Sequence, residues 1–423
     1  MIMPGRTLRR AASAIVAGGL LGVLGGCGAS AQDSSATTTT PAITPVPISA
    51  SSCPGTVLAA LSRVVRHVYL DGLVGERPAE ARVAIEHSAA LRAAVESDDA
   101  GAARAAVDAL LATGRMAHVL IRRDGRTLVD LGVPAVGPLQ GTIVGAGGAP
   151  IASYLTSVWS DSALAAESRS ITEGMIALRG KTGAIEESLA VPPAAVGTRG
   201  GLELGQSPYA YASIPAEGFP SGNVRVYVLR SVASTDQLCG ASRDATILDT
   251  LARVATLIYD GERGGQTTPQ IERVQRYGPL LRAVARRDPA ATRRAVESLL
   301  TQHVVRLRVI AGHTVLADVG GPYVLAPVQA PLLLGGRTIG RIVLSIQDDE
   351  GYKRLTRRLA GLRVLMYMGH RLVKNSLGPE PGTVPPSGAY VYRGREFRVF
   401  TLDAEAFPSG PLTIRVLVPI PYS

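Results

Sequence analysis

Lysine and aromatic residues are scarce in this chain. Of its 44 basic residues only Lys181, Lys353 and Lys374 are lysines, and aromatic residues make up 4% of the total. So few aromatic rings argue against a surface that stacks on nucleic-acid bases, and we expect no nucleic-acid partner. The arginine bias follows more often from genome composition than from a binding function, so arginine content alone marks no site.

The signatures of common enzymes are also missing. The six histidines form no H-E-x-x-H pair, and the chain has neither a G-x-S-x-G turn nor a G-x-x-x-x-G-K-[ST] phosphate loop. Lys181-Thr182-Gly183 matches one element of serine β-lactamases, but no lysine has a serine three residues before it. We therefore expect a protein without catalysis, metal or other cofactor.

Asp348, Asp349 and Glu350 form an acidic run that could hold a cation, since hard cations favour clustered carboxylates. EF-hand ligand spacing is absent, however. Acidic side chains are also common at the N-terminus of a helix, where the helix dipole favours them. A solvated turn before a helix is therefore the preferred interpretation.

Long apolar runs are missing except near the N-terminus. Three arginines precede the stretch Ala11–Leu24, which is about 21 Å long as a helix and too short for a bilayer core of roughly 30 Å. Leu24-Gly25-Gly26-Cys27 ends the stretch and resembles a bacterial lipobox. That resemblance implies cleavage before Cys27 and a diacylglycerol on its sulfur. An ordinary signal peptide is the alternative.

Residues 1–27 are thus expected to be a lipoprotein signal peptide with its lipobox. Residues 28–52, rich in Ser, Thr and Pro, are expected to be a disordered tether. No later segment reaches 18 apolar residues. We therefore predict that the lipid is the chain's membrane attachment and that the protein lies on the outer face of the cell membrane.

An internal repeat is the strongest signal in the sequence. Pro215–Gly222 and Asp403–Gly410 are identical at six of eight positions, and Asp130–Pro134 matches Asp318–Pro322 at the same offset of 188. Leu91-Arg-Ala93 matches Leu281-Arg-Ala283 at an offset of 190. Solenoid repeats are only about 20–50 residues long, so we interpret the repeat as duplication of a whole domain, with copies at 53–238 and 239–423.

The second copy has the clearer secondary-structure signals. Apolar spacing predicts helices at Thr246–Tyr259, Gln270–Ala285, Pro289–Gln302 and Gly351–Val373, with Asp288 capping the third. Strands are predicted at 304–310, 314–319, 324–334, 338–347, 389–401 and 412–418, with a hairpin at Gly335-Gly336. This order predicts an α+β fold in which each copy has one antiparallel sheet and long helices mainly on one face.

Two stretches of the second copy, Val309–Asp318 and Ile339–Asp348, resemble strands of extracellular Cache domains, also called PDC or PAS-like sensors. The resemblance covers about half of each copy. In copy one Ser157–Asp161 corresponds to Ser345–Asp349, and the hairpin before it is degraded to Gly145–Gly148. The resemblance implies a PAS-like sheet and an extracellular ligand-binding role. Cache domains usually sit between transmembrane helices and drive an output domain, and this sequence shows neither. A separate transmembrane signalling protein is therefore one optional partner.

Strand alternation places the polar residues of Arg341–Gln347 on one face, which the Cache resemblance implies is the ligand side. The apolar face is expected to pack on the Gly351–Val373 helix. The candidate ligand-binding residues are Arg341, Ser345, Gln347, Tyr390, Tyr392 and Arg398 in copy two, and Ser157, Trp159, Asp161, Tyr209 and Tyr211 in copy one. For Trp159, the chain's single tryptophan, a core or rim position is the preferred alternative.

Two cysteines remain once Cys27 is assigned to the lipid. Cys53 and Cys239 each precede the first helix of a copy. Domain termini are often close together, and an exported protein meets an oxidising environment. We therefore predict a Cys53–Cys239 disulfide, with two buried thiols as the alternative.

Charge is divided unevenly between the copies. Residues 57–242 hold 16 basic and 18 acidic side chains, whereas residues 243–423 hold 25 and 15. Copy two is thus the candidate for an anionic ligand or surface, with a uniformly solvated arginine surface as the alternative. The leading interpretation is a membrane-anchored lipoprotein that binds or senses a small-molecule ligand. The alternative is a structural or accessory lipoprotein that binds a partner protein or a cell-envelope polymer.

Overall fold

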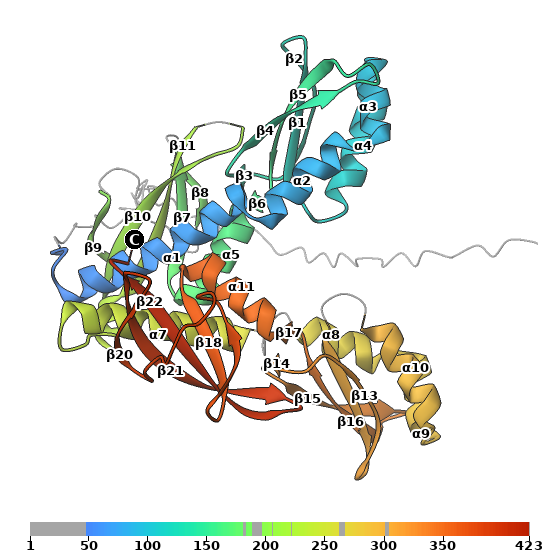
Figure 1. Ribbon diagram of the computed structural model, residues 1–423. Coiled ribbons are helices and arrows are strands. Elements are labelled where there is room, and N and C mark those ends of the chain that lie inside the picture. The colour runs from blue at the N-terminus through green and yellow to red at the C-terminus, as the bar shows by residue number, and fades with distance from the viewer. Residues whose placement is uncertain are drawn as a thin grey trace, which may run out of the picture. The chain divides into compact units, whose positions relative to one another are not determined.

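The computed structural model describes residues 48–180, 183–187 (backbone), 197–204, 206–220, 222–261, 267–300 and 304–422. Within these ranges helices and antiparallel strands form an α+β fold (Figure 1). The predicted signal peptide, the lipobox with Cys27 and most of the tether lie outside the described residues. None of the described helices combines the length and apolar character needed to cross a bilayer.

The first half, residues 53–238, contains a small and a large antiparallel sheet. Its helices are α1 (Cys53–Val74), α2 (Glu76–Glu86), α3 (Ala89–Glu96), α4 (Ala100–Leu111), α5 (Asp161–Thr172) and α6 (Val232–Asp236). The small sheet has the order β2-β1-β5-β4, with β1 (His118–Arg123), β2 (Arg126–Gly132), β4 (Leu139–Val144) and β5 (Pro150–Ser157). The large sheet has the order β8-β7-β11-β10-β9, with β7 (Met175–Gly180), β8 (Gly183–Glu187), β9 (Arg199–Leu204), β10 (Ser207–Glu217) and β11 (Asn223–Ser231). Between the sheets, β3 (Ala135–Val136) pairs with β6 (Trp159–Ser160).

The second half, residues 239–422, has the same order in its small sheet, and its large sheet repeats the first with β14 and β17 added at one edge. Its helices are α7 (Arg243–Gly261), α8 (Thr267–Gln275), α9 (Gly278–Ala285), α10 (Pro289–Leu299) and α11 (Asp349–Ala360). The small sheet, β13-β12-β16-β15, has β12 (Arg306–Ala311), β13 (Thr314–Gly320), β15 (Val328–Leu334) and β16 (Arg337–Ser345). The large sheet, β17-β14-β21-β22-β18-β19 with β20 on β21, has β14 (Val324–Leu325), β17 (Gln347–Asp348), β18 (Arg363–Met368), β19 (Arg371–Asn375), β20 (Gly388–Tyr392), β21 (Arg395–Phe407) and β22 (Gly410–Ile420). The prediction of one sheet per copy was therefore wrong, because the chain leaves the small sheet at Ser157 and Ser345 and begins a second one.

Two predicted helices are shorter than expected. The Gly351–Val373 helix ends at Ala360, because Gly361 takes a left-handed φ of 67° and its N–H bonds back to the Arg357 carbonyl. The following residues form β18 and β19 instead. Gln270–Ala285 is divided into α8 and α9, because Pro279 belongs in the first turn of a new helix rather than inside a continuous one. Asp288 caps α10 as predicted, accepting from Ala291 N at 2.9 Å.

The largest hydrophobic core contains residues of both halves. Helices α1 and α7 contact each other and both contact α5 and α11; α1 also packs on β10 and β11, while α7 packs on β21 and β22 (Figure 1). The core includes Val64 and Val68 of α1, Leu251 and Val254 of α7, and Val416 of β22, all almost fully buried. The two halves therefore share an interior: each large sheet is covered by helices of its own half, and the helices of the two halves pack on one another.

Buried contacts recur at equivalent positions of the two halves. The hydroxyl of Tyr69 accepts from the backbone N–H of Glu217 at 3.0 Å, and that of Tyr259 accepts from Glu405 at 3.0 Å. In helix α9 the structure changes the offset that relates one pair of equivalent residues. Leu280, not Leu281, is the fully buried equivalent of Leu91, so the offset there is 189 rather than 190. Duplication of a whole domain, with boundaries at 53–238 and 239–423, stays a prediction.

A disulfide joins Cys53 at the start of α1 to Cys239 before α7, with 5.7 Å between the two Cα atoms. This is the pairing expected from the sequence. It closes a segment of 186 residues. Because such a cross-link restricts the unfolded chain, it is expected to stabilise the fold that both halves share.

Replacing Cys53 and Cys239 together by Ser should lower the free energy of unfolding by about 2–5 kcal/mol, because the unfolded chain regains the entropy of a long loop. Urea denaturation of the parent and the double variant measures the difference. Thiol titration provides the control. In a Cys27→Ser background, the unreduced denatured protein should show no free thiol and the reduced protein two. Two reactive thiols before reduction would contradict the pairing.

Candidate functional site

The structure does not bring the predicted pocket residues of the second half together. Arg341 and Ser345 lie on β16 of the small sheet, whereas Tyr390, Tyr392 and Arg398 lie on β20 and β21 of the large sheet. Arg398 opposes Ala389 in the strand register, and Tyr390 opposes Phe397. Opposed residues share a face, so Arg398 points away from both tyrosines. The predicted common ligand face was therefore wrong.

Ser345 and Ser157 are buried at the exits of the small sheets. The Ser345 hydroxyl donates to the Leu325 carbonyl and accepts from Gln347 N at 3.3 Å. The Ser157 hydroxyl donates to the Val136 carbonyl and accepts from Trp159 N at 3.2 Å. Each hydroxyl therefore holds the crossing between two sheets rather than facing a ligand. Gln347 is buried as well, while Arg341 is exposed on the small sheet.

Trp159 is a core residue, the alternative preferred for it. Its indole N–H donates to the Val68 carbonyl at 3.1 Å, and its side chain is 5% exposed. Gly72 makes room for the ring, since a Cβ there would lie 2.1 Å from Trp159 Cδ1. Asp161 is also buried, in the first turn of α5. Trp159, just before α5, thus ties the start of that helix to α1.

The predicted tyrosines lie on the face of each large sheet opposite α1 and α7. Tyr211 packs near Tyr227 with ring centroids 6.1 Å apart, and Tyr209 borders the same cluster. In the second half the chain's own loop covers this face. Tyr390 donates to the Pro381 carbonyl, and Tyr392 donates to that of Pro379 at 2.8 Å. The loop residues thus occupy the place that a ligand was predicted to take.

The apolar face of β16 also packs differently from the prediction. Ile342 and Leu344 belong to a separate core with Leu280 and Val296 of α9 and α10. Helix α11 lies elsewhere because it follows the crossing at Ser345. The small sheets are therefore covered by the three-helix segments that precede them.

The two repeated motifs meet at the joint between the small and large sheets. In the first half His118 Nε2 lies 2.7 Å from Asp130 Oδ1, and its ring is 4.2 Å from that of Phe219. In the second half Asp318 accepts from Arg306 Nε at 2.8 Å and from Arg308 Nη2 at 2.6 Å. Both guanidinium groups lie over the Phe407 ring, at 5.3 and 4.6 Å. The repeat therefore preserves a structural contact that links residues about 90 positions apart.

Burial alone would raise the pKa of Asp318. The hydrogen bonds and charges of Arg306 and Arg308 outweigh that effect and hold the pKa below its usual value. The ionised carboxylate is therefore the form that the folded protein favours. Its contribution to stability is present above the pKa of the unfolded chain and is lost as the pH falls through the folded value.

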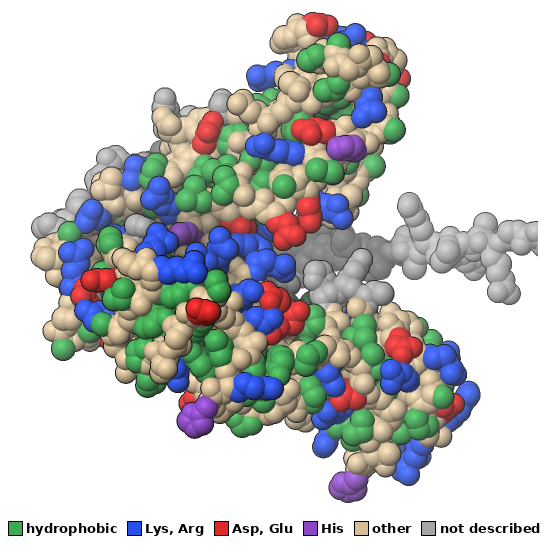
Figure 2. All heavy atoms as spheres, viewed as in Figure 1, with side chains coloured by type: hydrophobic (Ala, Val, Ile, Leu, Met, Phe, Trp, Pro, Cys, Tyr) green, Lys and Arg blue, Asp and Glu red, His purple; other side chains and the backbone are tan. Residues whose placement is uncertain are grey.

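A cleft of about 830 Å³ opens between α1 and α11. A volume of this size is in the range of small-molecule sites, roughly 300–1,000 Å³. Residues from both halves line it: His67, Leu70, Asp71, Val74, Gly75, Glu76, Glu350, Lys353, Arg354, Arg357, Arg358, Arg363, Asn375, Ser376, Leu377 and Gly378. Figure 2 shows Lys and Arg side chains gathered over this region of α11. The cleft is thus predominantly cationic.

The cations of the cleft differ in whether a carboxylate neutralises them. Lys353 lies 2.5 Å from Glu350, Arg358 lies 2.7 Å from Asp71, and Arg354 lies 3.9 Å from Glu76. Within the described part of the chain, Arg357 and Arg363 have no carboxylate partner. These two side chains leave positive charge available in the cleft.

Arg363 carries the clearest electrostatic signal. Burial lowers the pKa of its guanidinium, and the like charges of Arg357 and Arg395 lower it further. An arginine nevertheless stays protonated at neutral pH, so the three charges repel one another. A bound anion would relieve this repulsion, and a planar guanidinium suits carboxylate or phosphate oxygens.

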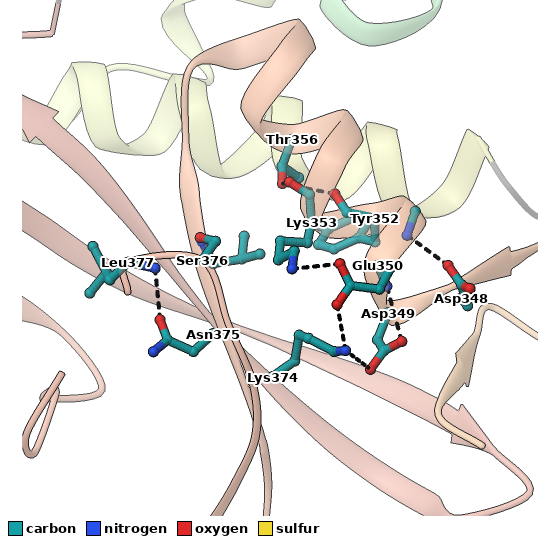
Figure 3. Close-up of polar contacts among 12 residues, drawn as sticks. Asp348, Asp349, Glu350, Tyr352, Lys353, Thr356, Lys374, Asn375, Ser376 and Leu377 are labelled. Carbon is teal, nitrogen blue, oxygen red and sulfur yellow. Dashed lines mark hydrogen bonds and ion pairs between the residues drawn. The ribbon is translucent and has the colours of Figure 1, made fainter. Parts of the chain in front are cut away.

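The acidic run beside the cleft forms ion pairs with lysines (Figure 3). Asp348 caps α11, accepting from Gly351 N at 2.7 Å. Lys374 Nζ lies 2.6 Å from Glu350 and 3.2 Å from Asp349. The hydrogen bonds from Lys353 and Lys374 lower the pKa of Glu350 to about 2. These contacts fit a turn before a helix, but Asp349 is buried rather than solvated. Among the described residues, no cluster of three metal-ligating side chains occurs.

A buried carboxylate forms the α1 side of the cleft. The Asp71 side chain is 3% exposed, and Arg358 Nε lies 2.7 Å from its Oδ1. Its Oδ2 has no hydrogen-bond partner among the described residues. Burial raises the pKa of the nearby Glu167 carboxyl. The positive charges of Arg77 and Arg358 partly offset this rise, and the charge of Asp71 adds to it. Arg358 thus ties α11 to acidic groups of the first half.

Sequence reasoning missed the cleft residues, although a signal was present. The run Lys353-Arg354-Leu355-Thr356-Arg357-Arg358 places four cations within two helical turns. The sequence pattern placed this run inside one predicted helix, Gly351–Val373. The turn at Gly361, which brings Arg363 back beside Arg357, was not recognised.

No family model matches the sequence, and no curated protein matches it. Among solved structures, an extracellular ligand binding receptor from Desulfohalobium retbaense DSM5692 is similar over 42% of this chain and 39% of its own, at 11% identity and a TM-score of 0.24. The ligand-binding domain of the Pseudomonas fluorescens chemoreceptor CtaA, in complex with L-isoleucine, is similar over 43% of this chain and 98% of its own, at 11% identity and a TM-score of 0.25. The match thus spans well under two thirds of the first receptor.

The joint contact can be tested by Asp318→Asn. The variant should lose about 1–3 kcal/mol of unfolding free energy, because it leaves two partly buried arginines short of an acceptor charge. Asp130→Asn is the matched control. The Asp130 side chain is 52% exposed against 20% for Asp318, so its loss should be below about 1 kcal/mol.

Urea denaturation at several pH values measures both variants. The deficit of Asp318→Asn should shrink as the pH falls below about 3.9, where the unfolded carboxylate gains its proton. Equal losses for the two variants would contradict a special role for the arginine pair.

Proposed function

We propose that this chain is an exported lipoprotein, anchored through Cys27, that binds a small anionic ligand in the cleft between α1 and α11. The observation that carries the proposal is the pair Arg357 and Arg363, which line the cleft without a carboxylate partner in the described structure. We assign the cleft a binding role and no catalytic step.

The position of the cleft supports a sensing role. Its walls come from α1 of the first half and from α11, β18 and the end of β19 of the second. A ligand held there would contact both halves and so strengthen their association. Binding energy can shift the arrangement of the halves only as far as the ligand prefers one arrangement. A response inside the cell would pass through a separate transmembrane protein.

The alternative, a protein that binds a partner or an envelope polymer, has its own support. In the second half, the large-sheet face predicted to bind a ligand is filled in the described structure by Tyr390, Tyr392 and the loop they contact. A filled core with the binding groups outside it suits an interaction protein. Under this alternative, the charged groups that bind the partner protein or polymer would lie on the exposed surface rather than in the cleft.

Small anions should stabilise the protein if the cleft binds them. Phosphate, sulfate, citrate and succinate are added to the full chain, with glucose as a neutral control, and the melting temperature is followed. At least one anion should raise it, because a ligand that binds only the folded state adds stability. Arg363→Gln and Arg357→Ala should each weaken that anion's binding by about 10–100-fold, the worth of one charge-assisted hydrogen bond.

Two further variants make the result specific. Glu350→Gln removes a carboxylate from the cleft and leaves Lys353 and Lys374 less neutralised, so it should tighten anion binding. Arg337→Ala removes an exposed arginine of the small sheet and should leave binding unchanged. If every anion acts equally on the parent and on Arg363→Gln, the assignment of the cleft is wrong.

Lipid attachment is tested separately. The full chain, expressed in a bacterium that processes lipoproteins, should incorporate labelled palmitate and sediment with membranes. Cys27→Ala should abolish both, because the anchoring sulfur is gone, while Cys53→Ala should retain the label. Labelling that persists in Cys27→Ala would show that the anchor lies elsewhere.

A further inference from the structure

The helix pairs α3–α4 and α9–α10 pack on the small sheets of the two halves (Figure 1). Their first residues are related by an offset of 189. Leu91 and Leu280 are both fully buried at an offset of 189. Asp99 and Asp288 cap α4 and α10 in the same way, each accepting from a backbone N–H three residues later at 2.9 Å. The outward-facing side chains of the two pairs can therefore be compared directly.

The exposed positions of these helix pairs differ in charge. In the second half they hold Arg282, Arg286, Arg287 and Arg294, where the first half has Ala93, Ser97, Asp98 and Ala105. We call these four exposed arginines the arginine face. None of them has a carboxylate partner in the part of the chain that the structure describes, whereas the neighbouring Arg276 and Arg293 pair with Glu272 and Glu297. Figure 2 shows basic side chains over α9 and α10.

Composition and helix capping do not explain the arginine face. A genome-wide arginine bias acts on both halves of one chain, yet only one half has these residues. Arginines near the end of α9 gain about 0.3–1 kcal/mol from the helix dipole, but α3 ends without a basic residue. Arg287 has a left-handed φ of 55°, a conformation that the equivalent Asp98, with φ 57°, suits better. The fold therefore does not require these arginines.

We propose that the arginine face binds a soluble polymer that carries repeated phosphate groups. Arg282 and Arg286 are one turn apart, about 6 Å along the helix, so neighbouring guanidinium groups can engage successive phosphates. Guanidinium groups bind phosphate oxygens in a two-pronged geometry. Several such contacts on an exposed surface suit an extended polyanion better than one small anion.

A lipid bilayer fits the arginine face less well. Helices that lie in a membrane interface place large apolar side chains into the lipid. Between Thr267 and Leu300 the described residues include no exposed large hydrophobic side chain. The face offers charge without an apolar anchor, which favours a polymer in solution.

Long-chain inorganic polyphosphate is the probe, titrated into the full chain at several salt concentrations. Arg282→Ala/Arg286→Ser, which installs the residues of the first half, should weaken binding by about tenfold or more and reduce the salt slope by about 1.4–1.8. Arg337→Ala/Arg341→Ala is the matched control. It removes the same charge from exposed positions of the small sheet and should change the affinity by less than about twofold.

Three results would overturn the proposal. Polyphosphate could fail to bind the parent, or the two double variants could weaken binding equally, which would indicate net charge alone. Alternatively, vesicles containing phosphatidylglycerol could bind in a manner that needs Arg282 and Arg286 while polyphosphate does not. The cleft is tested independently, since Arg363→Gln should leave polyphosphate binding intact and Arg282→Ala/Arg286→Ser should leave small-anion binding intact.

Discussion

The packing of α1, α5, α7 and α11 between the two large sheets is the constraint on which the rest of the structure depends. Helix α1 buries Leu58, Leu61 and Val65 as well as Val64 and Val68, so its apolar residues cover more than one side. A helix of that kind needs neighbours all round. The first half supplies β10, β11 and α5, and the second supplies α7 and α11. Each fully buried Val or Leu contributes roughly 1.5–3 kcal/mol, so separating the halves would be costly.

The small sheet of the first half belongs to this shared interior, whereas that of the second half has a separate core. Each joins the central body through a short crossing, held by a buried serine hydroxyl at Ser157 or Ser345. The aspartate and phenylalanine of the repeated motifs reinforce the same joint. One half completes it with His118 and the other with Arg306 and Arg308. The aspartate and the phenylalanine thus have the same structural role in both halves, while the side chain that pairs with the aspartate differs.

Features that depend on short-range chemistry could be predicted from the sequence. The hairpin at Gly335-Gly336 and the Asp288 cap each follow from a few neighbouring residues. The pairing of Cys53 with Cys239 followed from their places before equivalent helices. The α+β class followed from the order of helices and strands.

Features that depend on the path of the chain after a turn could not be predicted from the sequence. The apolar periodicity predicted a helix that continued beyond Gly361, because the residues of β18 are apolar enough to extend the helical pattern. The cleft exists because the chain turns there and returns beside α11 with Arg363. The predicted pocket failed for a related reason, because alternation gives the two faces of a strand but not the sheet that the next strand joins.

A comparison of equivalent positions shows where the second half carries positive charge that the first half lacks. Helices α5 and α11 match at an offset of 188, and α5 has Ala165 and Ala166 where α11 has Lys353 and Arg354. The first strand after the helix begins with Met175 in one half and Arg363 in the other. Because the backbone is retained, these changes were not needed to fold the protein. The same reasoning applies to α9 and α10, so two of the places where the second half carries positive charge that the first half lacks lie on a scaffold that forms without it. A scaffold of this kind can serve two anionic partners of different size, a small one enclosed between the halves and an extended one on the surface.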